Sequence, residues 1–201
     1  MILKSIDATT FEIIEGKRAI QKILKLRYQV LVSEYGYLPK NETQEITDEY
    51  DFNSNTIHIG AFYKGSQLVG ANRIVINSKL GIPSQDYFDF LNSPLPSQYG
   101  YPNLNKYLLA DISRLVATKK YHGNKFLVGY ELMKIAHSVA KKAGASFCCA
   151  AINPRAIKYF RSLGYCPLDS EKFCDKNKLP FIPMIGAIDK LAFSLINEHN
   201  L

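Results

Sequence analysis

The stretch DISRLVATKKYHGNKF, residues 111–126, decides how the chain is expected to fold. Its first part ends an apolar strand predicted over residues 107–116, and a long apolar helix is predicted over residues 124–143. Gly123 lies between the two. A glycine at a strand-to-helix junction allows backbone N–H groups near the helix N-terminus to face an anion. The stretch therefore predicts an anion-binding turn between a strand and a helix.

A second strand and a short helix follow this turn. Residues 146–152 are apolar and predict a buried strand, and the stretch NPRAIKYFRSLGY, residues 153–165, predicts the helix. Asn153 is a favourable N-cap, Pro154 suits the first helical turn, and Gly164 suits the C-terminal end. One further strand is expected within residues 181–196, before a short helix or tail.

The first half of the chain predicts a helix and a hairpin. Apolar residues recur at helical spacing over residues 11–35, which predicts a helix. Residues 56–63 and 68–77 predict two strands, and the short turn between them contains Gly65.

Two arginines are expected to be buried. Arg27 lies on the apolar stripe of the first predicted helix, and Arg73 shares a strand face with Val69, Ala71 and Val75. A buried guanidinium needs a carboxylate partner. The acidic segment of residues 45–51 can supply one, or it can be a solvated loop.

Asp111 interrupts an apolar strand. A carboxylate on a central strand is rarely there for stability, so Asp111 is a candidate for a functional or paired site. Arg114 is three residues further on and nominally on the opposite face, so only a bulge or a splayed strand would bring the two side chains together.

Residues 78–106 carry four prolines among several aromatic residues and show no periodicity. A loop of this length inside a compact domain is commonly functional or a cover. The segment is expected to be a lid over an apolar pocket or an irregular cover of the core.

Composition indicates a globular protein. The chain has 201 residues, of which 47% are hydrophobic, and this length fits a single domain over residues 1–201. There is no signal-peptide pattern at the start and no apolar run of roughly 18 residues, so we expect no membrane span and a cytoplasmic protein.

The charge and the cysteines exclude several classes of function. The net charge of +7 suggests an acidic partner, but no basic tail or aromatic-basic motif indicates nucleic acid. The four cysteines, Cys148, Cys149, Cys166 and Cys174, have neither zinc nor redox spacing and are expected to be inert thiols. The four histidines also lack metal-ligand spacing, so no metal is expected. His137 is expected to be structural.

Two motifs resemble those of the GNAT acyltransferases. Residues 153–165 resemble the family's N-x-x-A-x-x-x-Y/F-x-x-x-G-F/Y signature, and KYHGNK, residues 120–125, resembles its pyrophosphate turn, Q/R-x-x-G-x-G/A. The turn departs from the pattern at Lys120 and at Lys125. The resemblance implies an α/β (α+β) fold, a single GNAT-like domain with a central mixed, mostly antiparallel twisted sheet and helices on both faces.

The first half narrows the resemblance to acyl-homoserine-lactone (autoinducer) synthases and N-acyl amino acid synthases. Four elements occur in their order and approximate spacing: residues 27–31, 48–51, 70–73 and 111–114. The usual glutamate of the last element is Asp111 here, and the chain has no tryptophan. The amino acid synthase branch is therefore favoured.

The resemblance implies a role for each matching residue. Asp111 would act on the attacking amine, Arg114 would orient it, and a backbone N–H near Val116 would hold the thioester oxygen and also contact the donor. The acyl chain would lie under the aromatic loop, near Phe88. Four charged residues would shape the amine pocket: Arg27, Asp48, Asp51 and Arg73. Further donor-binding residues would be His122, Gly123, Asn124, Lys125, Asn153 and Tyr159.

The implied activity is transfer of a fatty acyl group from acyl carrier protein to the amino group of an amino acid or related amine. The alternatives are a CoA-dependent acetyltransferase, an acyl-homoserine-lactone synthase and a non-catalytic ligand-binding module. No tightly bound cofactor is expected, and the acyl-phosphopantetheine of the carrier, or acyl-CoA, would be the co-substrate. The carrier would dock on a group of basic residues, for which the alternative interpretation is an ordinary basic surface: Lys119, Lys120, Lys125, Arg155, Lys158 and Arg161.

Overall fold

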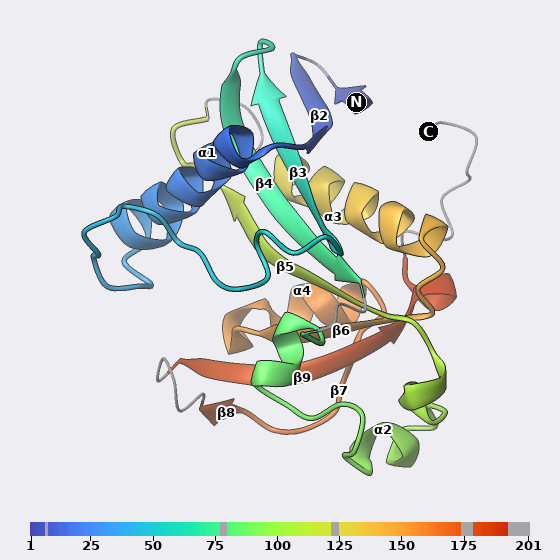
Figure 1. Ribbon diagram of the computed structural model, residues 1–201. Helices are drawn as coiled ribbons and strands as arrows, with labels where there is room; N and C mark the ends of the chain where they lie inside the picture. The colour runs from blue at the N-terminus through green and yellow to red at the C-terminus, as the bar shows by residue number, and fades with distance from the viewer. Residues whose placement is uncertain (7, 77–79, 122–124, 174–178, 193–201) are drawn as a thin grey trace. The chain divides into compact units, whose positions relative to one another are not determined.

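The computed structural model of the protein describes residues 1–6, 8–76, 80–121, 125–173 and 179–192, with only the backbone of Lys125 (Figure 1). The chain divides into two compact units. The first contains Met1–Ile74 and Ser113–Ala136, and the second contains Val75–Ile112 and His137–Asn200. The single domain expected from the length stays a prediction.

Strands and helices alternate along most of the chain. The strands are β1 (Ile2–Ile6), β2 (Thr9–Ile14), β3 (Thr56–Tyr63), β4 (Gln67–Ile76), β5 (Leu109–Ala117), β6 (Phe147–Ile152), β7 (Cys166–Pro167), β8 (Lys172–Phe173) and β9 (Pro180–Ala187). The α-helices are α1 (Lys17–Tyr28), α2 (Leu95–Gln98), α3 (Lys125–Lys142) and α4 (Ile157–Ser162). The π-helix η1 (Gln29–Glu34) continues α1, and the 3₁₀ helices are η2 (Pro83–Asp86), η3 (Leu104–Lys106), η4 (Pro154–Ala156) and η5 (Ile188–Lys190).

The strands hydrogen-bond in the order β1-β2-β3-β4-β5-β6-β9-β7, and β8 pairs with β9. Strands β5 and β6 are parallel, with Asp111 opposite Cys149, whereas β2 with β3 and β6 with β9 are antiparallel. A parallel pair needs a crossover connection, which α3 provides. The predicted mixed, mostly antiparallel sheet is therefore confirmed, as is the hairpin of β3 and β4.

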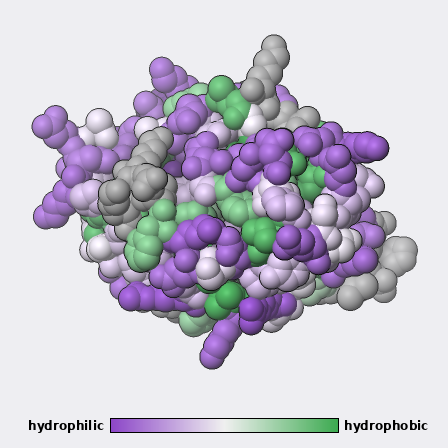
Figure 2. Space-filling view, turned by 90° about the horizontal axis from the view of Figure 1, so that it is seen from below, coloured by the Kyte–Doolittle hydropathy of each residue, from purple (hydrophilic) through white to green (hydrophobic). Residues whose placement is uncertain are grey.

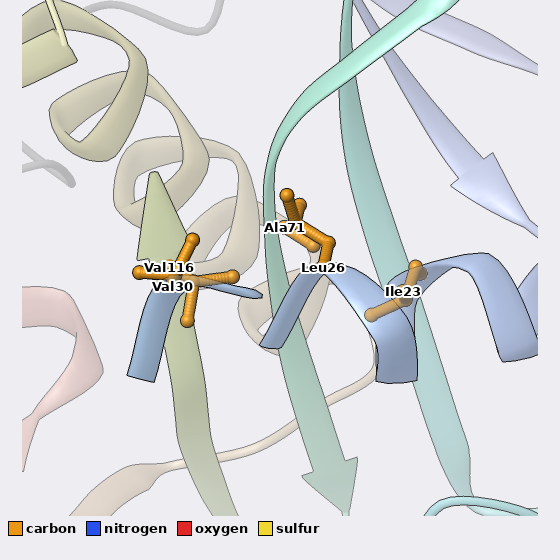
Figure 3. Close-up of a cluster of buried hydrophobic side chains, with 5 residues drawn as sticks. All are labelled: Ile23, Leu26, Val30, Ala71 and Val116. Atoms are coloured by element: carbon orange, nitrogen blue, oxygen red, sulfur yellow. The ribbon is translucent and has the colours of Figure 1, made fainter. Parts of the chain in front are cut away.

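In the first unit, α1 and the first half of α3 cover opposite faces of the sheet. Three residues of α1 and η1 pack with Ala71 of β4 and Val116 of β5 (Figure 3), namely Ile23, Leu26 and Val30. Gly70, the neighbour of Ala71, faces Val128 and Leu132 of α3 instead. This alternation follows from the pleat of a strand, in which successive residues point to opposite faces. Figure 1 shows the two helices on either side of β4.

Gly70 is needed for the close approach of α3, and this requirement can be tested. A Cβ at position 70 would lie 2.8 Å from Val128 Cγ1 and 3.1 Å from the backbone oxygen of Val116. We expect Gly70→Ala to lower the free energy of unfolding by about 1–3 kcal/mol through overpacking, measured by urea denaturation. Gly129→Ala on α3, where a Cβ meets nothing within 4 Å, is the matched control. It should stabilise by up to about 1 kcal/mol, and equal effects of the two variants would contradict this account.

The N-terminal prediction was partly wrong. Residues 11–14 belong to β2 rather than to a helix, and the hairpin of β1 and β2 was not predicted. Strand β2 pairs residue by residue with β3, from Thr9 opposite Tyr63 to Ile14 opposite His58. Gly16, with φ of 84°, separates this strand from α1. Pairing with β3 therefore overrides the helical periodicity read across residues 11–16.

In the second unit the predicted strand and capped helix are confirmed. β6 is buried, and the Asn153 side chain accepts a hydrogen bond from the backbone N–H of Arg155 at 3.0 Å. Pro154 begins the helical segment, and Gly164 follows it with φ of 96°. The last predicted strand corresponds to β9.

Large apolar side chains on the surface are dispersed among polar ones on the face that Figure 2 shows. Over the whole described surface, the large apolar side chains with the highest exposure include Phe126 and Phe173, with exposed fractions of 79% and 66%. No helix in the described ranges combines the length and apolar character that a membrane crossing requires.

Candidate functional site

Five charged side chains of the first unit form one hydrogen-bonded group, here called the charge cluster: Arg27, Asp48, Asp51, Arg73 and Arg114. Arg27 Nη1 donates to Asp51 Oδ1 at 2.7 Å. Arg73 Nη1 donates to Asp51 Oδ1 at 2.9 Å and to Asp48 Oδ1 at 2.5 Å. Arg114 Nη2 donates to Asp48 Oδ2 at 2.8 Å. The prediction that Arg27 and Arg73 find carboxylates in the acidic segment is therefore confirmed.

Hydrogen bonds within one turn also orient both carboxylates toward the arginines. Asp48 and Asp51 lie on one turn, in which the Asp48 N–H donates to Asp51 Oδ2 and the Tyr50 N–H donates to Asp48 Oδ1, each at 3.0 Å. The side chains of Arg27, Arg73 and Asp51 are all fully buried. A buried charge requires a partner and hydrogen bonds, and this turn supplies both.

Burial and ion pairing act in opposite directions on the pKa values of the cluster. Burial alone would raise the pKa of Asp48, but Arg73 and Arg114 hold it well below its usual value. Burial would likewise raise the pKa of Asp51, and Arg27 and Arg73 lower it overall. Burial lowers the pKa of Arg27 to about 10, although Asp51 opposes the shift. All three groups therefore stay charged at neutral pH.

Two further residues of the first unit contact the cluster and were not singled out from the sequence. His58 Nε2 lies 2.8 Å from the backbone oxygen of Asp51, which can only accept, so Nε2 carries the proton. His58 Nδ1 then faces Arg27 Nη2 at 3.5 Å as an acceptor. Burial lowers the pKa of His58, in keeping with a neutral ring. Ser113 Oγ accepts from Arg73 Nε and Nη2, each at 3.3 Å.

Ser113 and Arg114 are consecutive, yet both reach the charge cluster. Successive side chains of a regular strand point to opposite faces. Arg114 has φ of 57°, a left-handed conformation that is uncommon for a residue other than glycine. The strand is therefore irregular at Arg114, an irregularity of the kind considered from the sequence. Such strained residues concentrate at functional sites.

Val116 of β5 is 3% exposed and packs in the apolar cluster of Figure 3. Its side chain is thus part of the core. The role expected for a backbone N–H near Val116, holding the thioester oxygen, stays a prediction.

Asp111 lies in the second unit and is 2% exposed. Its Oδ2 accepts a hydrogen bond from the backbone N–H of Ser84 at 2.9 Å. Asp111 is paired in register with Cys149, and Cys149 with Ile185, so the three side chains share one face of the sheet. The predicted position of Asp111 on a central strand is confirmed, while its catalytic role stays a prediction.

The irregular segment, of which residues 80–106 are described, packs on the face that carries Asp111. Besides the Ser84 contact, the ring of Tyr101 meets Phe147 edge-on at 5.9 Å, and Tyr87 meets Phe181 at 5.3 Å. Phe88 is half-buried, and its ring lies 4.9 Å from that of the buried Phe90. These contacts anchor the segment at several points. The contacts are compatible with both interpretations made from the sequence, an irregular cover of the core and a lid over an apolar pocket.

The residues predicted to bind the donor are only partly described. His122, Gly123, Asn124 and the side chain of Lys125 lie outside the described residues. Asn153 uses its side chain as the cap of η4. Tyr159 is 36% exposed, and its ring lies edge-on to Phe160 at 5.8 Å.

Three other described side chains of reactive type, His137, Cys148 and Cys149, are structural. His137 Nε2 lies 2.7 Å from Tyr165 Oη in the interior, as expected for a structural histidine. Burial raises the pKa of Cys148 to about 12 and that of Cys149 well above its usual value, so both thiols are unreactive at neutral pH. Within the described ranges, no three His, Cys, Asp or Glu side chains are grouped in a way that could hold a metal ion.

The chain resembles known proteins over most of its length. The FeeM family, described as N-acyl amino acid synthase FeeM, matches residues 22–186. No curated protein matches in sequence. The solved structure of FeeM, an N-acyl amino acid synthase from uncultured soil microbes, is similar with a TM-score of 0.67 at 15% identity, covering 90% of this chain and 92% of that one.

Two other solved structures show the same fold. An acyl-CoA N-acyltransferase from Pseudomonas aeruginosa has a TM-score of 0.58 at 17% identity, covering 90% of this chain and 100% of its own. The CoA-dependent acyl-homoserine lactone synthase MesI has a TM-score of 0.61 at 14% identity, covering 88% of this chain and 85% of its own. At these identities the likeness concerns the fold alone.

Proposed function

This chain belongs to the FeeM family of N-acyl amino acid synthases and is an acyltransferase, and we propose that it moves a fatty acyl group from acyl carrier protein to the amino group of an amino acid or related small amine. In this reaction the amine nitrogen attacks the thioester carbonyl carbon. The C–N bond of an amide forms, the C–S bond breaks, and the thiol leaves with a proton. A reaction between these two substrates would take place in the cytoplasm.

The charge cluster is the observation that supports an amino acid as acceptor. It combines three guanidinium groups with two carboxylates, which leaves one formal positive charge. Arg114 has a side chain that is 28% exposed, whereas Arg27 and Arg73 are fully buried. A guanidinium pairs well with a carboxylate through two hydrogen bonds. Arg114 would therefore bind the acceptor's carboxylate, with Arg27, Asp48, Asp51 and Arg73 holding it in place.

Asp111 would supply the base. Only the neutral amine is a nucleophile, so a carboxylate that removes its proton, through a water molecule, accelerates attack. The Ser84 N–H fixes the orientation of this carboxylate. A backbone N–H near Val116 would stabilise the negative charge that develops on the thioester oxygen.

The donor would be bound through its phosphopantetheine. The phosphate would sit at the turn of residues 120–125, before the N-terminus of α3, where a helix favours an anion. Asn153 and Tyr159 would contact the donor, and the acyl chain would lie near Phe88. A basic protein would attract an acidic carrier, and CoA is the alternative source of the same group.

A product assay tests the proposal. The purified protein is incubated with long-chain acyl carrier protein thioesters or with acetyl-CoA, each with pooled amino acids, and the products are identified by mass spectrometry. We expect N-acyl amino acids carrying the long chain of the carrier thioester. An acetylated product alone would indicate a CoA-dependent acetyltransferase, and no product from either donor would indicate a binding module.

A further inference from the structure

A second polar group of the first unit lies apart from the charge cluster. Here called the Glu34 network, it contains Gln29, Glu34, Thr118 and Lys119. Glu34 Oε1 accepts from Thr118 Oγ1 at 2.5 Å and from Gln29 Nε2 at 2.8 Å. Glu34 Oε2 accepts from the backbone N–H of Lys119 at 2.7 Å. The Lys119 ammonium returns a hydrogen bond to the backbone oxygen of Glu34 at 2.8 Å and lies 3.9 Å from the centre of the Tyr35 ring.

The π-helix η1 places Glu34 in this position. η1 continues α1 directly, and the Tyr35 N–H donates to the backbone oxygen of Val30, five residues earlier. The wider turn changes the direction in which the following side chains point, and π-turns are frequent at functional sites. One continuous helical run thus carries Arg27 of the charge cluster and Glu34 of the network.

The network holds the start of the turn predicted to bind the donor phosphate. Residues 118–121 follow β5 directly, and all four have occupied backbone N–H groups. Thr118 N donates to Val69 O at 3.0 Å, and Lys119 N donates to Glu34 Oε2. Lys120 N donates to Thr118 Oγ1 at 3.2 Å, and Tyr121 N donates to Thr118 O at 3.4 Å. Tyr121 Oη lies 3.1 Å from Thr9 Oγ1. This end of the turn is therefore fixed on both sides.

Glu34 is charged when it makes these contacts. Burial would raise its pKa, but the hydrogen bonds from Lys119, Thr118 and Gln29, with the nearby charge of Lys120, lower the pKa overall. Hydrogen bonds to a carboxylate are roughly twice as strong as neutral ones. A neutral side chain at position 34 would therefore hold the turn less firmly.

We propose that Glu34 is a positioning residue for the acyl donor, holding residues 118–120 in place before the phosphopantetheine phosphate arrives. This inference rests on the proposed function. Residues that are already held in place need not be ordered when the donor binds, which spares that entropy cost. The consequence lies in donor binding rather than in chemistry.

Steady-state kinetics of the full chain test the proposal, with carrier thioester and amino acid varied separately. We expect Glu34→Ala to raise the KM for the carrier thioester about tenfold, with kcat and the KM for the amino acid within about twofold. Thr118→Val, which removes one hydroxyl at constant shape, should shift the same KM in the same direction. Glu34→Gln should fall between wild type and Glu34→Ala, because its amide oxygen can still accept from Lys119. Glu15→Gln, on an exposed glutamate of the same unit, is the control.

Hydrogen exchange supplies a readout apart from activity. The amides of Lys119 and Lys120 should exchange faster in Glu34→Ala than in wild type, with the exchange of β3 unchanged. An active wild type whose donor KM is the same in Glu34→Ala would overturn this inference and leave the proposed function intact. A variant with a lower kcat, higher KM values for both substrates and lower thermal stability would also overturn it, because these effects together would indicate a general structural role. An inactive wild type would reject the proposed function and, with it, this inference.

Discussion

Replacing Asp51 by asparagine lowers the free energy of unfolding by about 3–5 kcal/mol, the loss expected when one partner of a buried ion pair is removed. Asp51 accepts from both Arg27 and Arg73, and all three side chains are fully buried. Asparagine keeps the shape but leaves two buried guanidinium groups with one carboxylate fewer. Urea denaturation followed by circular dichroism measures the loss.

Two other variants calibrate this result. Asp48→Asn should cost less, because its side chain is 16% exposed and its partner Arg114 is 28% exposed. Asp169→Asn, which breaks a surface pair with Lys172, should change the stability by less than about 0.5 kcal/mol. If Asp51→Asn costs no more than Asp169→Asn, the cluster contributes nothing to holding the first unit together.

The same carboxylates set the acid sensitivity of the fold. The pKa values of Asp48 and Asp51 are lower in the folded protein than their ordinary value of 3.8. Their stabilisation is therefore complete above about pH 4 and is lost as the pH falls below it. Wild-type stability should fall more steeply in this acid range than that of Asp51→Asn.

Asp111→Asn should reduce kcat by about 10²–10⁴-fold, the usual contribution of general acid–base catalysis. Asparagine has nearly the same shape, and its amide oxygen can still accept from the Ser84 N–H, so the variant should remain folded. The substitution removes the carboxylate proposed to take a proton from the amine. Asp189→Asn, on an exposed carboxylate of the same unit, should leave kcat unchanged. Undiminished turnover in Asp111→Asn would show that another group is the base.

The parts of the site that could be predicted are charged residues at positions that the sequence pattern predicts to be buried. Arg27 and Arg73 lie among apolar residues at helix and strand spacing, and a buried guanidinium demands a carboxylate, so their ion pairs could be expected. Asp111 stands out because it interrupts an apolar strand. The strands from β3 to β6 and the long helix α3 follow from clear periodicity and from the turns between them.

Other features have no such signature. β2 is decided by its pairing with β3, which local periodicity does not reveal. His58 and Ser113 are single polar residues on strands, with no pattern that separates them from solvated ones. The Glu34 network depends on a π-helix, whose wider turn departs from the 3.6-residue repeat used to predict helices. The left-handed backbone of Arg114 could not be predicted, because nothing in the neighbouring sequence requires it. The sequence showed only that an irregular strand would be needed to bring the side chains of Asp111 and Arg114 together.

One measurement tests the central claim most directly: the mass of the product formed from an amino acid mixture and acyl carrier protein that carries a deuterium-labelled long acyl chain. The account predicts an amide that contains the labelled acyl chain and one amino acid, formed by wild type and lost in Asp111→Asn. Release of the labelled chain as a free fatty acid would contradict it. So would a carrier thioester that stays unreacted while acetyl-CoA gives acetylated amines.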